Sequence, residues 1–171
     1  MLEKLAPRSR AESIFHLDVD GLKDIGIRGL IFDLDNTLVE WGGMEIKPEL
    51  SEWILDMKRN GFKMCIVSNG LKDRVAHFAR ELDIPAVAKA IKPRKHPFKK
   101  ALEIMGTLPD QTAVIGDQIF TDILGGNRMD LYTILTHPIS KEEFVSTKAV
   151  RRLEKFVLKR LKKKGILSGQ E

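Results

Sequence analysis

The chain has 171 residues, of which 43% are hydrophobic and 31% charged; this suits one globular domain of residues 1–171 rather than a disordered or fibrous chain. The net charge of +5 lies at the C-terminus, where residues 141–171 hold ten basic and four acidic side chains. Because no leader and no bilayer-spanning apolar run is recognisable, we expect a cytoplasmic protein, with peripheral attachment to the inner face of the membrane as the alternative.

Short apolar strands alternate with amphipathic helices along the chain. In chain order, the predicted elements are a helical turn at 21–26, a strand at 29–33, a helix at 48–61, a strand at 62–67, a helix at 71–82, a weak strand at 85–88, a helix at 98–105, a strand at 112–116, a short helix at 122–128, a strand at 131–135 and a helix at 142–164. This order predicts a doubly wound, mostly parallel, Rossmann-like α/β sheet with its ligand site off the carboxyl ends of the strands.

The polar residues that follow the predicted strands form one chemical set. In chain order they are Asp33, Asp35 and Thr37, then Ser68 and Asn69, then Lys92, then Asp117 and Asp122. Carboxylates without a cluster of cysteine or histidine favour Mg²⁺ over Zn²⁺. A carboxylate can attack phosphorus, a metal and a lysine can neutralise the phosphate, and a second carboxylate can protonate the leaving oxygen. The set therefore indicates phosphoryl transfer.

The run Asp33-Leu34-Asp35-Asn36-Thr37-Leu38 resembles the first signature of the haloacid dehalogenase (HAD) superfamily, and the later strand-end residues resemble its other three motifs in order. The resemblance covers about residues 28–135. It implies that Asp33 is a nucleophile and metal ligand, and that Asp35 is the general acid/base and lends its backbone carbonyl to the metal. The remaining phosphate-binding and metal-binding roles that it implies fall on Thr37, Ser68, Asn69, Lys92, Asp117 and Asp122.

The details of these motifs narrow the expected reaction. An Asp at position 35 is typical of the phosphatases of the superfamily, and the motifs are similar to those of small YqeG-type phosphatases of subclass IIIA, which are related to mitochondrial phosphatidylglycerophosphate phosphatases. Little chain separates Thr37 from Ser68, so no cap domain fits over the site. The resemblance implies that a member without a cap acts on a large substrate, such as a protein, a nucleic acid or a lipid. No obligate protein partner is implied.

We therefore expect a magnesium-dependent phosphomonoester hydrolase that works through an aspartyl-phosphate, with phosphatidylglycerophosphate as the substrate that the resemblance suggests. A nucleotide or a nucleic-acid end phosphate is the alternative substrate. The alternative class of function is a non-catalytic module that kept the fold and docks on RNA or the ribosome.

Simpler structural roles compete with several of these assignments. Residues 35–37 and Ser68-Asn69 could be turn and helix-capping residues, and Asp122 could only cap its helix. Lys89 competes with Lys92 for the phosphate-balancing role. Trp41 could equally belong to a flap over the site or to the core. A structural role is favoured for two other features: Gly125-Gly126-Asn127 as a helix C-terminus or backbone approach point rather than a phosphate cradle, and Cys65 as a buried side chain rather than a nucleophile.

The predicted helix at 142–164 has an apolar face and a basic face. Helical spacing groups Val150, Leu153, Val157 and Leu161, with basic side chains opposite them. Either this helix packs on the sheet with a solvated basic face, or it is an interfacial helix that binds anionic lipid or RNA phosphates.

Overall fold

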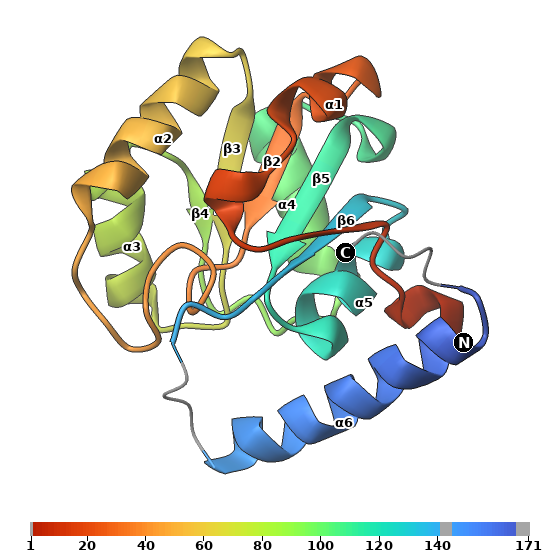
Figure 1. The fold of residues 1–171 in the computed structure, drawn as a ribbon. Helices are drawn as coiled ribbons and strands as arrows, with labels where there is room; N and C mark the ends of the chain where they lie inside the picture. The colour runs from red at the N-terminus through yellow and green to blue at the C-terminus, as the bar shows by residue number, and fades with distance from the viewer. Residues whose placement is uncertain (1, 141–144, 167–171) are drawn as a thin grey trace.

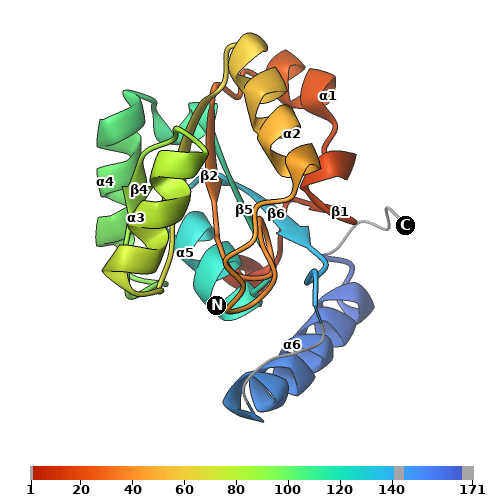
Figure 2. The ribbon, with the colours of Figure 1, turned by 90° about the vertical axis from the view of Figure 1, so that its left-hand side faces the viewer.

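A computed structural model describes residues 2–140 and 145–166 of the chain, which form a parallel sheet with helices on both faces (Figures 1 and 2). The strands are β1 (Ser9–Ala11), β2 (Gly29–Phe32), β3 (Lys63–Val67), β4 (Ala86–Val87), β5 (Thr112–Gly116) and β6 (Tyr132–Thr136). They are ordered β1-β6-β5-β2-β3-β4, and every pairing is parallel. The predicted doubly wound, Rossmann-like fold is confirmed.

Helices α1 to α5 lie in the connections between successive strands, and α6 follows the last strand. The α-helices are α1 (Val19–Asp24), α2 (Pro48–Arg59), α3 (Lys72–Glu81), α4 (Lys95–Met105), α5 (Leu124–Asn127) and α6 (Val145–Lys163). The short helices are η1 (Leu2–Leu5), η2 (Ile14–His16), η3 (Pro109–Gln111) and η4 (Ile119–Ile123), the last of which is a π-helix.

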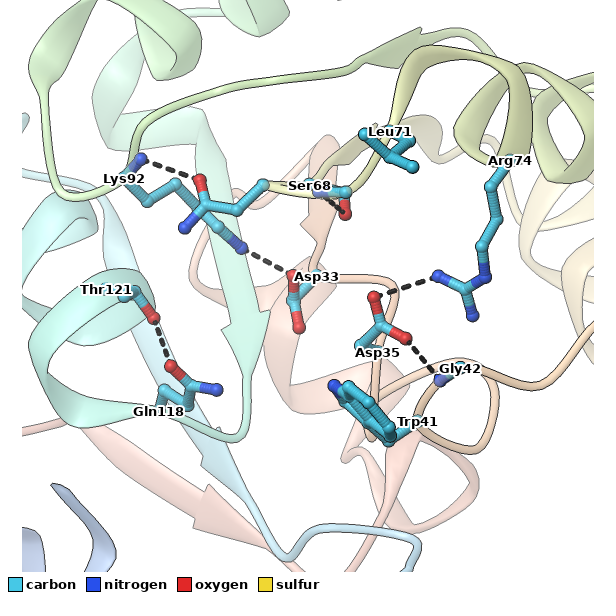
Figure 3. Close-up of a pocket in the computed structure, with 12 residues that line it drawn as sticks. Asp33, Asp35, Trp41, Gly42, Ser68, Leu71, Arg74, Lys92, Gln118 and Thr121 are labelled. Atoms are coloured by element: carbon cyan, nitrogen blue, oxygen red, sulfur yellow. Dashed lines mark hydrogen bonds and ion pairs between the residues drawn. The ribbon is translucent and has the colours of Figure 1, made fainter. Parts of the chain in front are cut away.

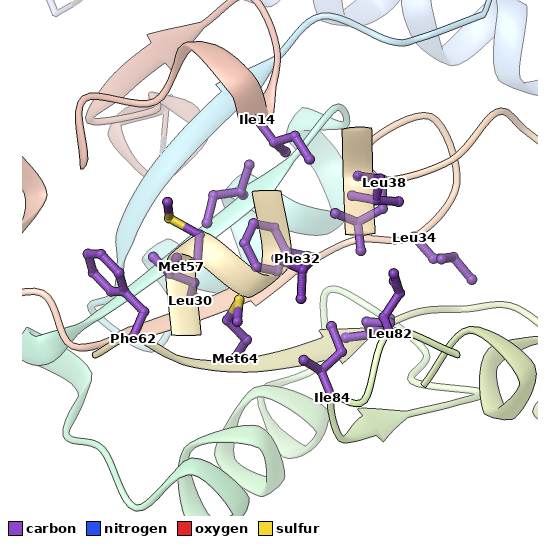
Figure 4. Packing of buried hydrophobic residues seen from close by; sticks show 14 of the residues in the cluster. Ile14, Leu30, Phe32, Leu34, Leu38, Met57, Phe62, Met64, Leu82 and Ile84 are labelled. Atoms are coloured by element: carbon purple, nitrogen blue, oxygen red, sulfur yellow. The ribbon is translucent and has the colours of Figure 1, made fainter. Parts of the chain in front are cut away.

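Alternate side chains of β2 fill two separate cores. Leu30 and Phe32 lie in one cluster with residues of α2 and α3, as Figure 4 shows for part of that cluster. Ile31 lies in the other, together with Phe98 of α4. Because successive side chains of a strand point to opposite faces, a strand covered on both sides needs an unbroken apolar run, and residues 29–32 provide one.

The register of the sheet brings the strand ends level with one another. Phe32 pairs with Ile66 of β3 on one side and with Ile115 of β5 on the other. The residues that follow these three strands therefore emerge together at one edge of the sheet. Of the described residues between β2 and β3, only α2 forms a helix, and it buries Leu50 and neighbouring apolar residues against the sheet. This stretch places no cap over the edge.

Three local features differ from the prediction. The edge strand β1 was not predicted, because Ser9-Arg10-Ala11 is short and lacks an apolar run. Helix α4 begins at Lys95 rather than Phe98. The helix expected at 122–128 is preceded by a π-helical turn that begins at Ile119, so Asp122 lies inside this turn.

Helix α6 corresponds to the helix predicted at 142–164, although residues 142–144 lie outside the described part of the chain. It buries Val157 and Leu161 as expected, but Val150 and Leu153 are exposed, so half of the predicted packing face is wrong. The buried carboxylate of Glu154 instead accepts a hydrogen bond from the Ile119 N–H at 2.7 Å. Among the described helices, none has the length and apolar character needed to cross a bilayer.

Candidate active site

A pocket of about 440 Å³ opens at the carboxyl edge of the sheet (Figure 3). Five residues of the predicted site line it: Asp33, Asp35, Ser68, Asn69 and Lys92. The others that line it are Trp41, Gly42, Gly70, Leu71, Arg74, Gln118 and Thr121. Four strand-end segments thus contribute to one cavity, as the strand order requires.

Lys92 joins two parts of the site. Its ammonium nitrogen lies 2.5 Å from Asp33 Oδ1, which follows β2, and 2.6 Å from Asp122 Oδ1 in η4. All three side chains are at least nine-tenths buried, so these charge-assisted contacts are poorly screened by water. Lys89, the competing lysine, is exposed. The geometry therefore assigns to Lys92 the contact with the predicted nucleophile.

Burial and neighbouring charges perturb both members of the contact between Asp33 and Lys92. Burial raises the pKa of Asp33 to about 7; the Lys92 ammonium opposes this rise, and the Asp122 carboxylate adds to it. Burial alone would lower the pKa of Lys92, but the carboxylates of Asp122 and Asp33 hold that pKa above its usual value. Lys92 is therefore a fixed positive charge, and a further cation would favour the ionised form of Asp33.

Three buried carboxylates form a cluster that suits a metal ion. Asp33, Asp117 and Asp122 each present an oxygen, and these oxygens lie within 4.8 Å of one another. Three hard oxygen donors fit a divalent cation such as Mg²⁺. Gly116 makes room for this cluster, because a Cβ atom there would lie 2.4 Å from Asp122 Cγ. The predicted metal ligands that act through side chains are thus brought together.

Asp122 has two contacts that explain its position inside η4. One carboxylate oxygen accepts the Gln118 N–H at 3.2 Å, and the other contacts Lys92. The N-cap of η4 is Gln118, so Asp122 is not the N-cap residue that one interpretation of the sequence gave it. Asp122 therefore supports the start of the π-helical turn and also contacts Lys92 of the candidate active site.

Ser68 and Asn69 occupy the turn after β3. Ser68 Oγ accepts the Gly70 N–H at 3.0 Å, which leaves the hydroxyl hydrogen available to a ligand. Asn69 Oδ1 accepts the Lys92 N–H at 2.8 Å, so it fixes the backbone that carries the lysine. The N-cap of α3 is Leu71, so the alternative that Ser68 and Asn69 cap this helix is wrong.

The loop after β2 bears Asp35 and Thr37. Asn36 adopts a left-handed conformation (φ 63°), and its N–H donates to the Val39 carbonyl at 2.7 Å, so this segment is a tight turn as well as a motif. Thr37 is buried and does not line the pocket; its Oγ1 has no hydrogen-bond partner within the described residues. Its predicted phosphate-binding role stays a prediction, as does the use of the Asp35 carbonyl as a metal ligand.

Arg74 is a pocket residue that the sequence analysis missed. Its guanidinium donates to Asp35 Oδ2 at 2.9 Å and to the Gly43 carbonyl at 2.8 Å, and the Gly42 N–H donates to Asp35 Oδ1 at 3.0 Å. Arg74 therefore ties the loop at 40–43 to α3 and orients Asp35 (Figure 3). The one available signal was a charged residue in the first turn of the helix after Ser68. Trp41, 39% exposed beside this loop, belongs to the flap and not to the core.

Two further open points are settled by packing. A Cβ atom on Gly125 would lie 2.4 Å from Phe98 Cε2, and one on Gly126 would lie 2.3 Å from Val114 Cγ1. These glycines therefore let α5 approach α4 and the sheet and do not form a phosphate cradle. Cys65 is fully buried, and burial raises its pKa to about 12, so it is a core side chain and not a nucleophile.

Fold and site together define an α/β enzyme with a buried carboxylate–lysine centre for phosphate chemistry, and within the described residues no cap covers this centre. The haloacid dehalogenase-like hydrolase family model matches residues 39–130, and the chain belongs to this family. It is 41% identical, over the whole length of both chains, to the probable phosphatase YqeG of Bacillus subtilis. It is 34% identical over 94% of its length to phosphatidylglycerophosphate phosphatase 1 of Arabidopsis thaliana, of which it covers 49%. The chain is a HAD-family phosphatase.

Solved structures support the fold. The cobalt-bound deoxy-D-mannose-octulosonate 8-phosphate phosphatase of Haemophilus influenzae superposes with a TM-score of 0.53 over 85% of this chain and 95% of its own, at 14% identity. A putative HAD family hydrolase of Streptomyces avermitilis superposes with a TM-score of 0.51 over 65% of this chain and 67% of its own, at 21% identity.

Proposed function

We propose that this phosphatase hydrolyses phosphomonoesters with Mg²⁺ and through an aspartyl-phosphate (an acyl phosphate) on Asp33. The observation that carries the proposal is the contact of one buried ammonium, Lys92, with both Asp33 and Asp122, beside the carboxylate of Asp117. Lys92 and Asp33 also line the pocket, whereas Asp117 and Asp122 lie behind them and do not line it. A purely structural ion pair does not need a third carboxylate or an opening to solvent, whereas phosphoryl transfer needs both a cation site and access.

In the first step, an oxygen of Asp33 attacks phosphorus while the bond from phosphorus to the leaving oxygen breaks. Asp35 gives the departing oxygen a proton, so the products are an alcohol and phosphorylated Asp33. In the second step, Asp35 removes a proton from water as the water oxygen attacks phosphorus. Inorganic phosphate leaves, and Asp33 is restored. The contacts of Asp35 with Arg74 and Gly42 keep it beside Asp33 throughout.

The remaining residues neutralise and orient the phosphoryl group. Lys92 supplies a permanent positive charge, and the Ser68 hydroxyl can donate to a phosphoryl oxygen while its own oxygen accepts from Gly70. Asp33, Asp117 and Asp122 would hold Mg²⁺, which, when bound, would reduce the repulsion between the Asp33 carboxylate and the anionic phosphate. Asn69 acts indirectly, by fixing the Lys92 backbone.

Phosphatidylglycerophosphate is the substrate that we propose. Its support is the likeness to a plant protein named for this activity, together with a pocket that none of the described elements between the strands covers as a cap. A large lipid headgroup can reach such a pocket and shield the reacting atoms from water. We propose that the protein acts at the inner face of the membrane. Nucleotides and nucleic-acid end phosphates are the alternative substrates that the same assay can exclude.

The test compares the wild type with Asp33→Asn. Phosphate release from p-nitrophenyl phosphate and from phosphatidylglycerophosphate should require Mg²⁺, stop with EDTA and fall by at least about a thousandfold in the variant, because an amide is a poor nucleophile. Thermal unfolding shows that the variant is folded. Activity within about tenfold of the wild type would remove Asp33 from the nucleophile role. Faster hydrolysis of a nucleotide than of phosphatidylglycerophosphate would show that a nucleotide, and not the lipid, is the preferred substrate.

A further inference from the structure

The rim of the catalytic pocket carries large apolar side chains that contact water. Trp41 and Leu71 line the pocket and are 39% and 73% exposed (Figure 3). Ile91 does not line the pocket itself, but it directly precedes the pocket residue Lys92 and is 59% exposed. The three residues belong to three different loops, after β2, β3 and β4, that all lie at the carboxyl edge of the sheet. Isolated exposed apolar residues are ordinary, but a group around an active-site opening indicates an apolar partner.

Exposed basic side chains surround this rim. They lie in the same loops or at the start of the helices that follow them: Lys72, Lys89, Arg94 and Lys95. Of the acidic neighbours, Glu40 is already paired with Lys47 at 3.4 Å, and the exposed carboxylates of Glu45 and Asp73 are fewer than the four basic side chains. The pocket therefore opens on a surface that is both apolar and positively charged.

Helix α6 presents a second surface of the same kind at the same end of the molecule (Figures 1 and 2). Leu153 and Phe156 are 54% and 57% exposed on its outer side. The exposed basic side chains beside them are Arg152, Lys155, Lys159 and Lys163. On its inner side, α6 accepts a hydrogen bond from η4 through Glu154, and Thr121 of η4 lines the pocket. The π-helix η4 therefore lies between α6 and the pocket.

We propose that the pocket rim and the outer side of α6 together dock on an anionic lipid bilayer, with the pocket mouth toward the headgroups. The substrate is then a phosphomonoester lipid presented in the plane of the membrane. This choice of substrate rests on the proposed function, whereas the docking does not need turnover. The positive charge selects anionic over zwitterionic lipid, and the aliphatic side chains of Leu71 and Leu153 favour lipid over nucleic acid, whose backbone offers them no apolar contact.

The two tryptophans allow a direct test of the docking orientation. Trp53 packs edge-on against Phe15 and Phe32, with ring centroids 6.2 and 5.8 Å away, whereas Trp41 lies at the pocket mouth. The Trp53→Phe protein therefore reports on Trp41 alone, and Trp41→Phe reports on Trp53 alone. With vesicles of phosphatidylglycerol and phosphatidylcholine at low salt, the emission of Trp41 should shift to the blue and that of Trp53 should not. An absent shift for Trp41, or an equal one for Trp53, would overturn the orientation.

Paired substitutions test the surface on α6. In Leu153→Ser/Phe156→Ser, partitioning onto the anionic vesicles should fall about tenfold or more, because the two exposed side chains would otherwise enter the bilayer. Leu108→Ser is the matched control: it is 58% exposed but precedes β5, at the opposite edge of the sheet, so binding should not change. Thermal unfolding checks that each variant is folded.

The activity assays separate this inference from the proposed function. Turnover of p-nitrophenyl phosphate should be unchanged in the paired variant, while hydrolysis of phosphatidylglycerophosphate in vesicles should fall with binding. A wild-type protein that hydrolyses the soluble substrate but ignores anionic vesicles, or that prefers single-stranded RNA to them, would refute the docking and leave the phosphatase intact. A protein that binds the vesicles and hydrolyses p-nitrophenyl phosphate, but does not hydrolyse phosphatidylglycerophosphate, would refute the lipid substrate instead.

Discussion

Replacing Lys92 by Met tests the centre of the site. Lys92 compensates two carboxylates, Asp33 and Asp122, at 2.5 and 2.6 Å, and all three groups are buried. Removal of one partner of a buried ion pair typically costs about 3–5 kcal/mol, because the other charge stays buried without compensation. For a domain of this size, each kcal/mol corresponds to about 2–4 °C in Tm. The metal-free Lys92→Met protein should therefore melt at least about 6 °C below the wild type.

The loss of stability should depend on pH and on the metal. Burial raises the pKa of Asp33 to about 7 and Lys92 opposes that rise, so removal of Lys92 raises the pKa further. The folded variant then binds more protons than the folded wild type near neutral pH. Its deficit in stability should therefore grow as the pH rises from about 5 to about 8. Mg²⁺ should reduce the deficit, since a cation among the carboxylates replaces part of the missing charge.

The assay combines thermal unfolding in EDTA and in Mg²⁺ with phosphate release, and Lys89→Met is the control. Lys89 is exposed, so its substitution should change stability by less than about 0.5 kcal/mol and leave activity in place. Lys92→Met should lose at least about a hundredfold in turnover, as for the loss of one donor to a transition-state oxyanion. A stable, active Lys92→Met together with an inactive Lys89→Met would refute the assignment.

Three further predictions concern separate features of the site and core. Asp35→Asn should slow a glycerol phosphate ester far more than p-nitrophenyl phosphate, whose leaving group needs little protonation; equal losses would contradict an acid role. Gly116→Ala should displace Asp122, raise the Mg²⁺ concentration for half-maximal activity and cost about 1–3 kcal/mol in stability; an unchanged magnesium titration would disprove the need for that space. Cys65 should react with iodoacetamide at pH 8 at least about a thousandfold more slowly in the folded than in the urea-unfolded protein, because burial raises its pKa to about 12 and labelling requires opening.

The sequence predicted the fold best where one structural requirement can be met by only one type of residue. A buried parallel strand needs a continuous apolar run, so β2, β3 and β5 could be located from composition, and the polar residues after them had to meet at one edge. The convergence of Asp33, Lys92 and Asp122 follows from that topology. The choice between Lys89 and Lys92 did not follow, because it depends on the backbone path of the loop after β4.

Other features depend on contacts that periodicity cannot describe. Arg74 in α3 meets Asp35 in the loop after β2, two segments far apart in the sequence, and no local pattern marks such a pair. Spacing correctly grouped Val157 and Leu161 on the packed side of α6, but it could not show where along the helix packing begins, so Leu153 was wrongly placed. Glu154 was counted only as a charge, although it is buried and hydrogen-bonded.

The hydrogen bond from Ile119 to Glu154 affects how the tail should be studied. Ile119 begins the turn that carries Asp122, and its N–H is buried with an acceptor that α6 alone supplies. Deletion of the C-terminus would remove that acceptor together with the buried side chains of Val157 and Leu161, and would loosen one wall of the pocket. A truncated protein that failed to reach the membrane would therefore be expected to lose turnover of soluble substrates as well, and the two defects could not be told apart. A chimeric tail that retains Glu154, Val157 and Leu161 but replaces the outer residues would keep the pocket wall packed while changing where in the cell the protein is found.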